Sequence, residues 1–390
     1  MSLAHTIIGV TKMKKLILAL ILHLPATSFA HNLLWLDADQ ITSSTITIRQ
    51  VEGHSELGSS GSYFDLGQGS GNTINIDMQG DNAGCCNYLT GNFAGQSNSS
   101  LKVEMNGSGT GNVLQLNYQR TSISNYHHVD VDINSTGSTN KFYIYDHSAN
   151  DTTGDDHSNT SIEVYIIDSS YNNELWIYQE GQRQTTKVTI DGDSNDVYVW
   201  NGGTGTYTQG VTSLADLAST AYTQYIYLTG NSNYVKSKTW NNSNTSIIIT
   251  GNSNKVTDYN DDDDWMLNKD GIVKIDINGD SNTLGYYQVG WTGNCVDCSY
   301  LTVDIDSDGT DIDVKQHGGG NTATIKVYGS SSYSFDLDVH QSQSHTFIMC
   351  FNRAHQTSNY DGDFNSQSFH SETWNSSTIY STGSAADCIP

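Results

Sequence analysis

The sequence predicts an all-β protein that folds as a β-solenoid, a stack of strand-turn-strand repeats interrupted by irregular loop insertions. Three observations favour this fold class. Short runs alternate β-branched or aromatic residues with polar ones. A glycine-led turn ending in Asn recurs along most of the chain. Long amphipathic helical patterns are nearly absent, and residues 211–220, VTSLADLAST, are the best candidate for a short helix or a loop insert.

The recurring turn has the form Gly-x-x-Asn and is followed by a second alternating strand. Examples are GSGNTINIDM from residue 69, GDSNDVYVW from residue 192 and GDSNTLGYYQVG from residue 279. Successive asparagines of this turn are separated by 21 to 40 positions: Asn72, Asn112, Asn140, Asn173, Asn195, Asn233, Asn254, Asn282 and Asn321. Within the last step, DGTDIDVKQHG fits the pattern if Thr310 takes the Asn place. Periods of this size indicate a solenoid or another repeat array.

The phase of the alternation places the same residue types on one face of every repeat. Because side chains of a strand alternate between two faces, Asn173, Leu175, Ile177 and Gln179 share one face. The sets Asn282, Leu284, Tyr286, Gln288 and Thr310, Ile312, Val314, Gln316 repeat this order. In the turn, Gly permits a positive φ, and Asn is expected to occupy the left-handed region.

Stacking of the repeats explains why this face is apolar with amides at both ends. A single strand pair cannot bury an apolar face in water, whereas stacked repeats cover one another and can join their amides in ladders. A meander or sandwich of hairpins is the alternative, but the recurrence of the same polar residues in the same phase favours the solenoid. The predicted ladder residues are Gln50, Asn173, Gln179, Asn195, Asn233, Asn254, Asn282, Gln288 and Gln316.

This pattern resembles the curlin repeat of bacterial curli fibre subunits. The matching segments are NELWIYQEG from Asn173, NTLGYYQVG from Asn282 and TDIDVKQHG from Thr310, and residues 44–53, STITIRQVEG, place Gln50 similarly. The resemblance implies secretion and assembly into extracellular amyloid fibres of a biofilm matrix. The chain departs from the family in its unequal repeat lengths and in its insertions at residues 83–100, 202–222 and 258–271.

The N-terminal residues have the order of a secretory signal peptide. Lys12, Lys14 and Lys15 precede the apolar run Leu16 to Leu24, and small residues lead to a predicted cleavage after Ala30. The apolar run is too short for a membrane anchor. We therefore expect a signal peptide at 1–30, an N-terminal cap at 31–43, repeats at 44–341, a C-terminal cap at 342–390, and a secreted or cell-surface location without a membrane span.

The charge of the chain excludes one class of partner. The sequence has 42 Asp and Glu against 17 Lys and Arg, giving a formal net charge of −25 at pH 7. A phosphate backbone would be repelled, so nucleic acid is not an expected partner. Solubility in a crowded or salty extracellular environment is the favoured explanation of this acidity, and capture of cations is the alternative.

The six cysteines form three local sets behind the signal sequence. An even number in an exported chain favours disulfides, although the connectivity cannot be deduced from the sequence. The spacing of Cys295 and Cys298 is also half of a zinc site, but no second such pair occurs. The candidates are Cys85 with Cys86, Cys295 with Cys298, and Cys350 with Cys388.

One acidic segment matches the first half of a calcium loop. Asp304, Asp306 and Asp308 alternate before Gly309, but Lys315 stands where the loop would need its Glu. An outward row of aspartates between inward Val303 and Ile305 explains the same residues and is favoured over Ca²⁺ binding. Residues 260–265, NDDDDW, likewise favour an exposed loop over a metal-binding cage.

Three classes of function fit these features. The first is a structural fibre or matrix subunit that associates with itself or with related subunits. The second is a monomeric β-solenoid adhesin or phage-fibre-like protein that binds surface glycans through outward aromatic residues such as Trp176 and Tyr178, although a signal peptide argues against a virion part. The third is a β-helix enzyme that degrades polysaccharides. Catalysis is not expected, because no nucleophile or zinc motif occurs and only four Arg are present.

Overall fold

The computed structural model is all-β in the part of the chain that it describes, with long parallel sheets and no helix. The described residues are 5–11, 17–23, 31–39, 41–51, 54–58, 64–66, 69–80, 87–93, 96–107, 113–120, 127–135, 141–148, 161–167, 172–180, 185–202, 222–239, 243–258, 266–269, 271–289, 299–306, 311–317, 321–328, 336–341, 345–351, 360–361, 370–374 and 377–381. The segment 211–220 lies outside them.

The chain divides into two compact units. Unit 1 spans Met1–Asp196 and Gly203–Thr206, and unit 2 spans Val197–Gly202 and Tyr207–Pro390.

Unit 1 contains two long sheets, here called A1 and B1. Sheet A1 consists of β1 (His5–Thr11), β3 (His31–Asp39), β6 (His54–Leu57), β7 (Phe64–Asp65), β10 (Asn87–Asn92), β13 (Val113–Arg120), β15 (Lys141–Ser148) and β17 (Glu174–Glu180). Sheet B1 consists of β2 (Ile17–His23), β5 (Thr45–Val51), β9 (Thr73–Gly80), β12 (Ser99–Gly107), β14 (His127–Ser135), β16 (Ser161–Ile167) and β18 (Thr185–Asp191). A small third sheet joins β4 (Ile41–Thr42), β8 (Gly69–Ser70) and β11 (Gln96–Ser97).

Unit 2 repeats this arrangement in sheets A2 and B2. Sheet A2 consists of β19 (Asp196–Gly202), β21 (Tyr234–Thr239), β23 (Lys255–Asp258), β24 (Met266–Lys269), β26 (Thr283–Val289), β28 (Asp311–His317), β30 (Asp336–Gln341) and β32 (Tyr360–Asp361). Sheet B2 consists of β20 (Tyr222–Thr229), β22 (Ser243–Thr250), β25 (Gly271–Asn278), β27 (Ser299–Asp306), β29 (Asn321–Tyr328), β31 (His345–Phe351), β34 (Ser377–Ser381) and β33 (His370–Trp374).

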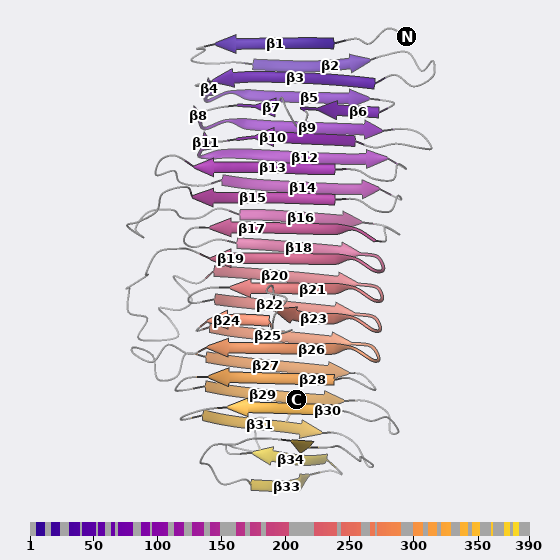
Figure 1. Cartoon of the computed structure of the whole chain (residues 1–390), viewed down its shortest axis with the longest axis vertical. Coiled ribbons are helices and arrows are strands. Elements are labelled where there is room, and N and C mark those ends of the chain that lie inside the picture. The colour runs from indigo at the N-terminus through magenta and orange to yellow at the C-terminus, as the bar shows by residue number, and fades with distance from the viewer. Residues whose placement is uncertain are drawn as a thin grey trace. The chain divides into compact units, whose positions relative to one another are not determined.

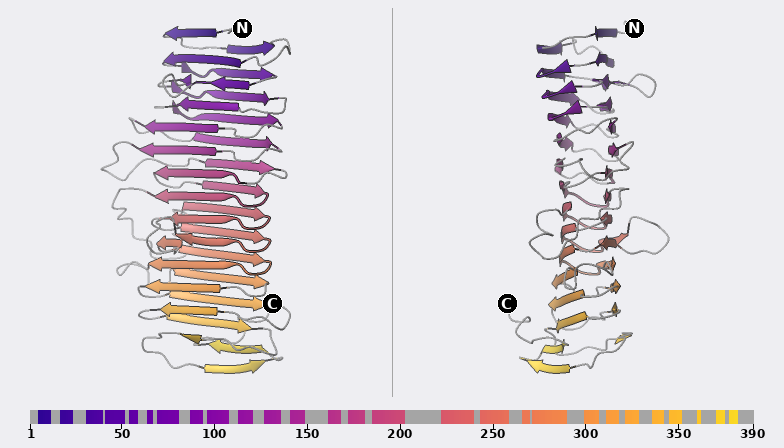
Figure 2. Two further views of the ribbon diagram at one scale, coloured as in Figure 1. Left: turned by 45° about the vertical axis from the view of Figure 1, so that its right-hand side comes forward. Right: turned by 90° about the vertical axis from the view of Figure 1, so that its left-hand side faces the viewer.

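Within each unit, successive long strands alternate between the two sheets, whose strands run in opposite directions (Figure 1). The strands on either side of a turn therefore belong to different sheets, and each pairs in parallel with the strand one repeat further along, as β22 does with β25. Figure 2 shows the two layers of each unit edge-on. This pairing differs from a meander of hairpins, in which consecutive strands pair with each other. We call one strand of each sheet, with the turn between them, a rung.

The core of each unit consists of in-register columns of apolar side chains. In sheet B1 one column runs through five neighbouring strands, all of its residues at most 2% exposed: Ile46, Ile74, Leu101, Val129 and Ile162. Sheet B2 contains the column Ile247, Ile275, Val303 and Ile325, each 0% exposed. Burying such a side chain contributes about 1.5–3 kcal/mol, so the columns are the main favourable term. The inward positions predicted from the alternation, Val188, Ile190, Val273 and Ile275 among them, are confirmed.

Two rungs are split by insertions within a strand. Strands β6 and β7 both pair with β3 and β10, and strands β23 and β24 both pair with β21 and β26. An insertion can therefore enter the middle of a strand while the neighbouring rungs keep their parallel register.

The terminal segments also contribute strands. Strands β1 and β2, which lie within the predicted signal peptide, pair in parallel with β3 and β5. Residues 31–43, the predicted N-terminal cap, contain β3 and β4, and these pair with β6 and β8. At the other end, β34 pairs antiparallel with both β31 and β33. No helix long and apolar enough to cross a bilayer occurs among the described residues.

The stacked turns use a four-residue conformation with two positive φ angles. In residues 279–282, Gly279 has φ 133° and Ser281 has φ 57°, and the turns at 192, 230 and 251 follow the same pattern. The left-handed residue is therefore the one before Asn, whereas the sequence predicted Asn itself. Asn instead directly precedes the next strand, with its side chain directed inward: Asn195, Asn233, Asn254 and Asn282 are at most 1% exposed.

We predict that Gly279→Ala strongly destabilises the protein. A Cβ at this position would overlap the carbonyl oxygen of Gly251 in the neighbouring turn and lie 2.6 Å from its carbonyl carbon, and φ 133° disfavours any L side chain. The expected loss is about 3 kcal/mol in the free energy of unfolding. Gly71→Ala is the control: φ is +67° there, but the nearest atom to the added Cβ is 3.6 Å away, so the loss should be about 1 kcal/mol. Equal losses in chemical denaturation would contradict this description of the turn.

Candidate functional site

The stacked turns of unit 2 are joined by a buried ladder of asparagines, here called the inner ladder. The backbone N–H of Asn233 donates to Oδ1 of Asn254 at 2.8 Å, and the backbone N–H of Asn254 donates to Oδ1 of Asn282 at 2.8 Å. Nδ2 of Asn282 donates to the carbonyl of Gly279 at 2.6 Å, within its own turn. Asn254 and Asn282 thus each satisfy a backbone donor of the preceding repeat.

Unit 1 contains related links with more varied residues. The backbone N–H and Nδ2 of Asn173 both donate to Oδ1 of Asn195, at 3.1 and 2.8 Å. Near the N-terminus, the N–H of Ser44 donates to Oδ1 of Asn72 at 3.0 Å, and the N–H of Asn72 donates to Oγ of Ser99 at 3.2 Å. Of the predicted ladder positions, Asn173 and Asn195 are therefore joined in unit 1, and Asn233, Asn254 and Asn282 are joined in unit 2. Sequence reasoning missed Ser44 and Ser99, which also link neighbouring turns. Ser44 donates through its backbone N–H, and Ser99 accepts through its hydroxyl oxygen.

A second ladder runs along the exposed side of the same turns and is here called the outer ladder. The N–H of Asn252 donates to Oδ1 of Asn231 at 2.8 Å, and the N–H of Asp280 donates to Oδ1 of Asn252 at 2.6 Å. These bonds point from the later repeat to the earlier one, opposite to the inner ladder. Sequence reasoning missed this ladder, although Asn and Asp recur at the second position of the Gly-x-Ser-Asn turns.

Polar residues also occur in the core at the far end of the strands. Gln179 is 0% exposed and accepts a hydrogen bond at 2.7 Å from Oγ1 of Thr186, across from sheet A1 to sheet B1. Gln50 is buried as well. The side chains of Gln288 and Gln316 lie outside the described residues, but their backbones pair in register, Gln288 with Gln316. The predicted inward direction is confirmed for Gln50 and Gln179 and stays a prediction for the other two.

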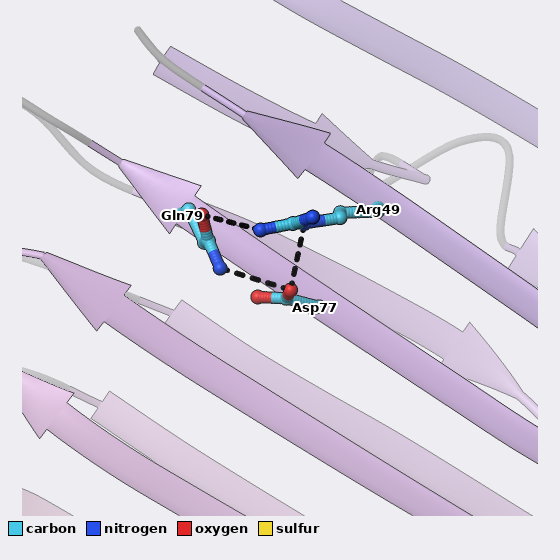
Figure 3. Close-up of polar contacts among 3 residues, drawn as sticks. All are labelled: Arg49, Asp77 and Gln79. Carbon is cyan, nitrogen blue, oxygen red and sulfur yellow. Dashed lines mark hydrogen bonds and ion pairs between the residues drawn. The ribbon is translucent and has the colours of Figure 1, made fainter. Parts of the chain in front are cut away.

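The outer face of sheet B1 carries a row of ion pairs. Nε of Arg49 lies 3.1 Å from Oδ2 of Asp77, and Nη2 of Arg49 donates to Oε1 of Gln79 at 3.1 Å (Figure 3). Further along, Nζ of Lys102 lies 2.8 Å from Oε1 of Glu104 and 3.2 Å from Oδ2 of Asp132. Burial raises the pKa of Asp77 although Arg49 opposes the shift. These half-exposed pairs each contribute about 0–1 kcal/mol, so they specify register rather than dominate stability.

The outer face of sheet A1 carries a polar and aromatic cluster. Trp176 and Tyr178 alternate with buried Leu175 and Ile177 and so face outward, as predicted, although both are partly buried. Around Glu174, the indole Nε1–H of Trp176 donates to Oε1 at 2.6 Å, Tyr143 OH donates to the same oxygen at 3.4 Å, and Nζ of Lys141 lies 3.4 Å from Oε2. This carboxylate therefore fixes three groups from two adjacent strands.

The outer face of sheet A2 holds a group of lysines and tyrosines, of which Lys236 is buried and Tyr198, Tyr234 and Lys255 are partly buried. Lys236 is 5% exposed, and its Nζ lies 5.1 Å from the ring centroid of Tyr234 and 5.8 Å from that of Tyr198. Nζ of Lys255 lies 5.5 Å from the Tyr234 ring. Cation–π contacts of this kind stabilise a charge that is largely removed from water, as that of Lys236 is.

The predicted calcium ligands lie on an ordinary strand. Asp304 and Asp306 alternate with Val303 and Ile305, which are 0% exposed, so the two carboxylates face outward. Asp304 pairs in register with Asp276, and burial followed by this neighbouring carboxylate raises its pKa. Among the described residues, His, Cys, Asp and Glu form no group of three suited to a metal ion. Asp308 and residues 260–265 lie outside those residues, so Ca²⁺ binding stays untested.

The cysteine predictions also remain untested. Cys350 lies in β31, but its side chain is outside the described part of the chain. The other predicted partners fall entirely outside it: Cys85, Cys86, Cys295, Cys298 and Cys388.

Comparisons with known proteins return no match to a family model, a curated protein or a solved structure. The resemblance to curlin repeats therefore depends only on the residues and stays a prediction.

We predict that Asn282→Ala costs about 1–3 kcal/mol of unfolding free energy, because it leaves the buried N–H of Asn254 without its acceptor. Asn252→Ala is the matched control, since it removes the same kind of bond on the exposed side, where water replaces it, and should cost about 0.5 kcal/mol or less. Urea denaturation measures both. A loss for Asn282→Ala no larger than that for Asn252→Ala would contradict the role of the inner ladder.

We further predict that Asp304→Asn raises the melting temperature at neutral pH. Because the pKa of Asp304 is raised in the folded protein, its ionised form opposes folding above that pKa, and the penalty disappears as the pH falls through it toward the unfolded value. The advantage of the variant should therefore shrink as the pH is lowered toward 4. Asp280→Asn, at an exposed turn position, is the control. An advantage that is absent at pH 7 or that grows on acidification would contradict the prediction.

Proposed function

We propose that the protein is a secreted structural subunit, a β-solenoid of curlin-like repeats that assembles with copies of itself into extracellular fibres or a biofilm matrix. The observation that carries the proposal is the inner ladder. In the repeats 230–233, 251–254 and 279–282, each turn presents to the next the same backbone donors, the same glycine contact and the same inward amide. A surface built this way is complementary to another copy of the same turn.

The pattern of pairing gives a physical route to assembly. All described pairings are parallel except two at the C-terminal end, so a terminal rung presents unpaired strand edges. Identical, in-register strands with buried amides are the arrangement found in cross-β fibres. Cleavage after Ala30 would remove β1 and β2 and make β3 and β5 the first strands of sheets A1 and B1. The same cleavage that accompanies export would then expose the edges of β3 and β5.

The resemblance and the composition support the same function. Segments NELWIYQEG and NTLGYYQVG have the Asn and Gln-x-Gly positions of curlin repeats, and Asn173, Gln179 and Asn282 are buried. A net charge of −25 suits a protein that stays soluble until it is exported.

Seeded assembly tests this proposal. The protein beginning at His31 should form fibres visible by electron microscopy. The lag phase of its assembly should shorten when fibre fragments are added as seeds. The fibres should give X-ray reflections at about 4.7 and 10 Å. Gln179→Ala should slow growth, because Thr186 loses its buried acceptor, whereas Gln115→Ala, at an exposed position, should grow like the wild type. A particle that stays monomeric for days, with no response to seeds, would overturn the proposal.

A monomeric adhesin is the second candidate, and specific features favour it. The antiparallel strands β33 and β34 interrupt the parallel pattern at one end of unit 2, and two rungs are split by insertions. The cluster of Lys141, Tyr143, Glu174 and Trp176 offers polar and aromatic groups on one outer face. A glycan array would then detect binding by the monomer that Trp176→Ala abolishes, and absence of any glycan signal would remove this candidate.

A further inference from the structure

The core of unit 2 contains a cluster of buried polar residues where apolar columns would be expected. Nε2 of Gln224 donates to Oδ1 of Asn201 at 3.1 Å, and Oγ of Ser237 donates to Oε1 of Gln224 at 2.5 Å. These residues come from three strands of both sheets, β19, β20 and β21. We call the cluster the polar core; its members are at most 1% exposed and comprise Asn201, Gln224, Ser237, Thr239 and Thr245.

Two hydroxyls in this region are buried without a hydrogen-bond partner among the described residues. Oγ1 of Thr239, in β21, belongs to the polar core, and the OH of Tyr286, in β26, lies on the same sheet. Both residues are 0% exposed. An unsatisfied buried hydroxyl costs about as much as a lost hydrogen bond, so each of the two requires a physical explanation.

Both hydroxyls belong to strands that flank the same irregular rung. Thr239 pairs in register with Asn268 of β24, and Tyr286 pairs in register with Met266 of β24. Strand β24 is the second part of the split rung, whose first part, β23, ends at Asp258 opposite Ser237. Two members of the polar core, Ser237 and Thr239, therefore lie on one side of the split rung in sheet A2, and Tyr286 lies on its other side.

We propose that this part of the core is an internal hydration site, in which ordered water molecules bridge Thr239 and Tyr286 to the polar core. Water suits the chemistry because each orphan hydroxyl needs an acceptor for its proton, and water accepts as well as donates. A bare cation would satisfy only oxygen lone pairs and leave both O–H groups unbonded. The surrounding amides and hydroxyls supply the two to four polar partners that a buried water requires.

The site extends the account of the fold beyond the proposed function and does not depend on it. The polar core lies beside the split rung, where β23 and β24 together take the place of one strand between β21 and β26. Polar residues and internal water accommodate the break while the adjacent rungs keep their register.

Conservative substitutions distinguish a hydrated site from a dry one by the sign of their effect. If water bonds the hydroxyls, Thr239→Val and Tyr286→Phe each remove real hydrogen bonds and should lower the urea midpoint, by on the order of 0.3 M. If the hydroxyls are unsatisfied, the same changes remove a penalty, and the midpoint should stay or rise. Thr257→Val is the calibration, because Oγ1 of Thr257 is buried and donates directly to Tyr234 OH at 3.2 Å.

A crystal structure of the full chain supplies the second readout. The expected result is solvent density about 2.7–3.2 Å from Oγ1 of Thr239 and from the OH of Tyr286, with midpoints of both variants below the wild type and comparable to that of Thr257→Val. Absence of solvent density beside either hydroxyl, or a midpoint at or above the wild type for either variant, overturns the proposal.

Discussion

The requirement that a buried backbone N–H find an acceptor determines how the repeats of this protein stack. At the stacked turns of unit 2 the chain enters the core at an asparagine, and the N–H of that residue is bonded to a side chain rather than to a strand carbonyl. In the repeats around Asn233 and Asn254, Oδ1 of the next inward asparagine is the acceptor, at 2.8 Å. A repeat is therefore incomplete until its neighbour is in place. This dependence explains why the turn is specified more strictly than the strands, whose apolar columns accept Ile, Val, Leu or Met.

The other residues of the turn follow from the same close approach. For the amides to meet, neighbouring turns must touch through their backbones, so the first position has no room for a Cβ, as at Gly251 and Gly279. The third position takes the left-handed conformation at Ser232, Ser253 and Ser281. The second position faces solvent and forms the outer ladder, with bonds in the opposite direction. Two antiparallel sets of amide bonds thus hold each turn on both sides, and sliding by one residue would break both.

Much of the fold could be predicted from the alternation alone. The side-chain period of two assigned Leu175, Ile177 and Gln179 to the core and Trp176 to the outer face, because no other phase buries an apolar set. The left-handed residue was misassigned to Asn, since both Ser and Asn tolerate turns and only the stacked contacts decide between them. The partners of the glutamines, Thr186 with Gln179 and Asn201 with Gln224, depend on which strands face each other across the core, which spacing does not reveal. The split rung at β23 and β24 was hidden because residues 258–271 read as one insertion.

Hydrogen exchange of individual backbone amides tests the inner ladder most directly. If side-chain oxygens of the next repeat hold these groups, the amides of Asn233 and Asn254 should exchange as slowly as that of Ile275 in the core of sheet B2, although both lie at turns. The amides of Asn252 and Asp280, bonded on the exposed side, should exchange faster. Exchange of the Asn233 and Asn254 amides at the rate of an unstructured loop, with the core strands still protected, would contradict a fold that depends on this ladder.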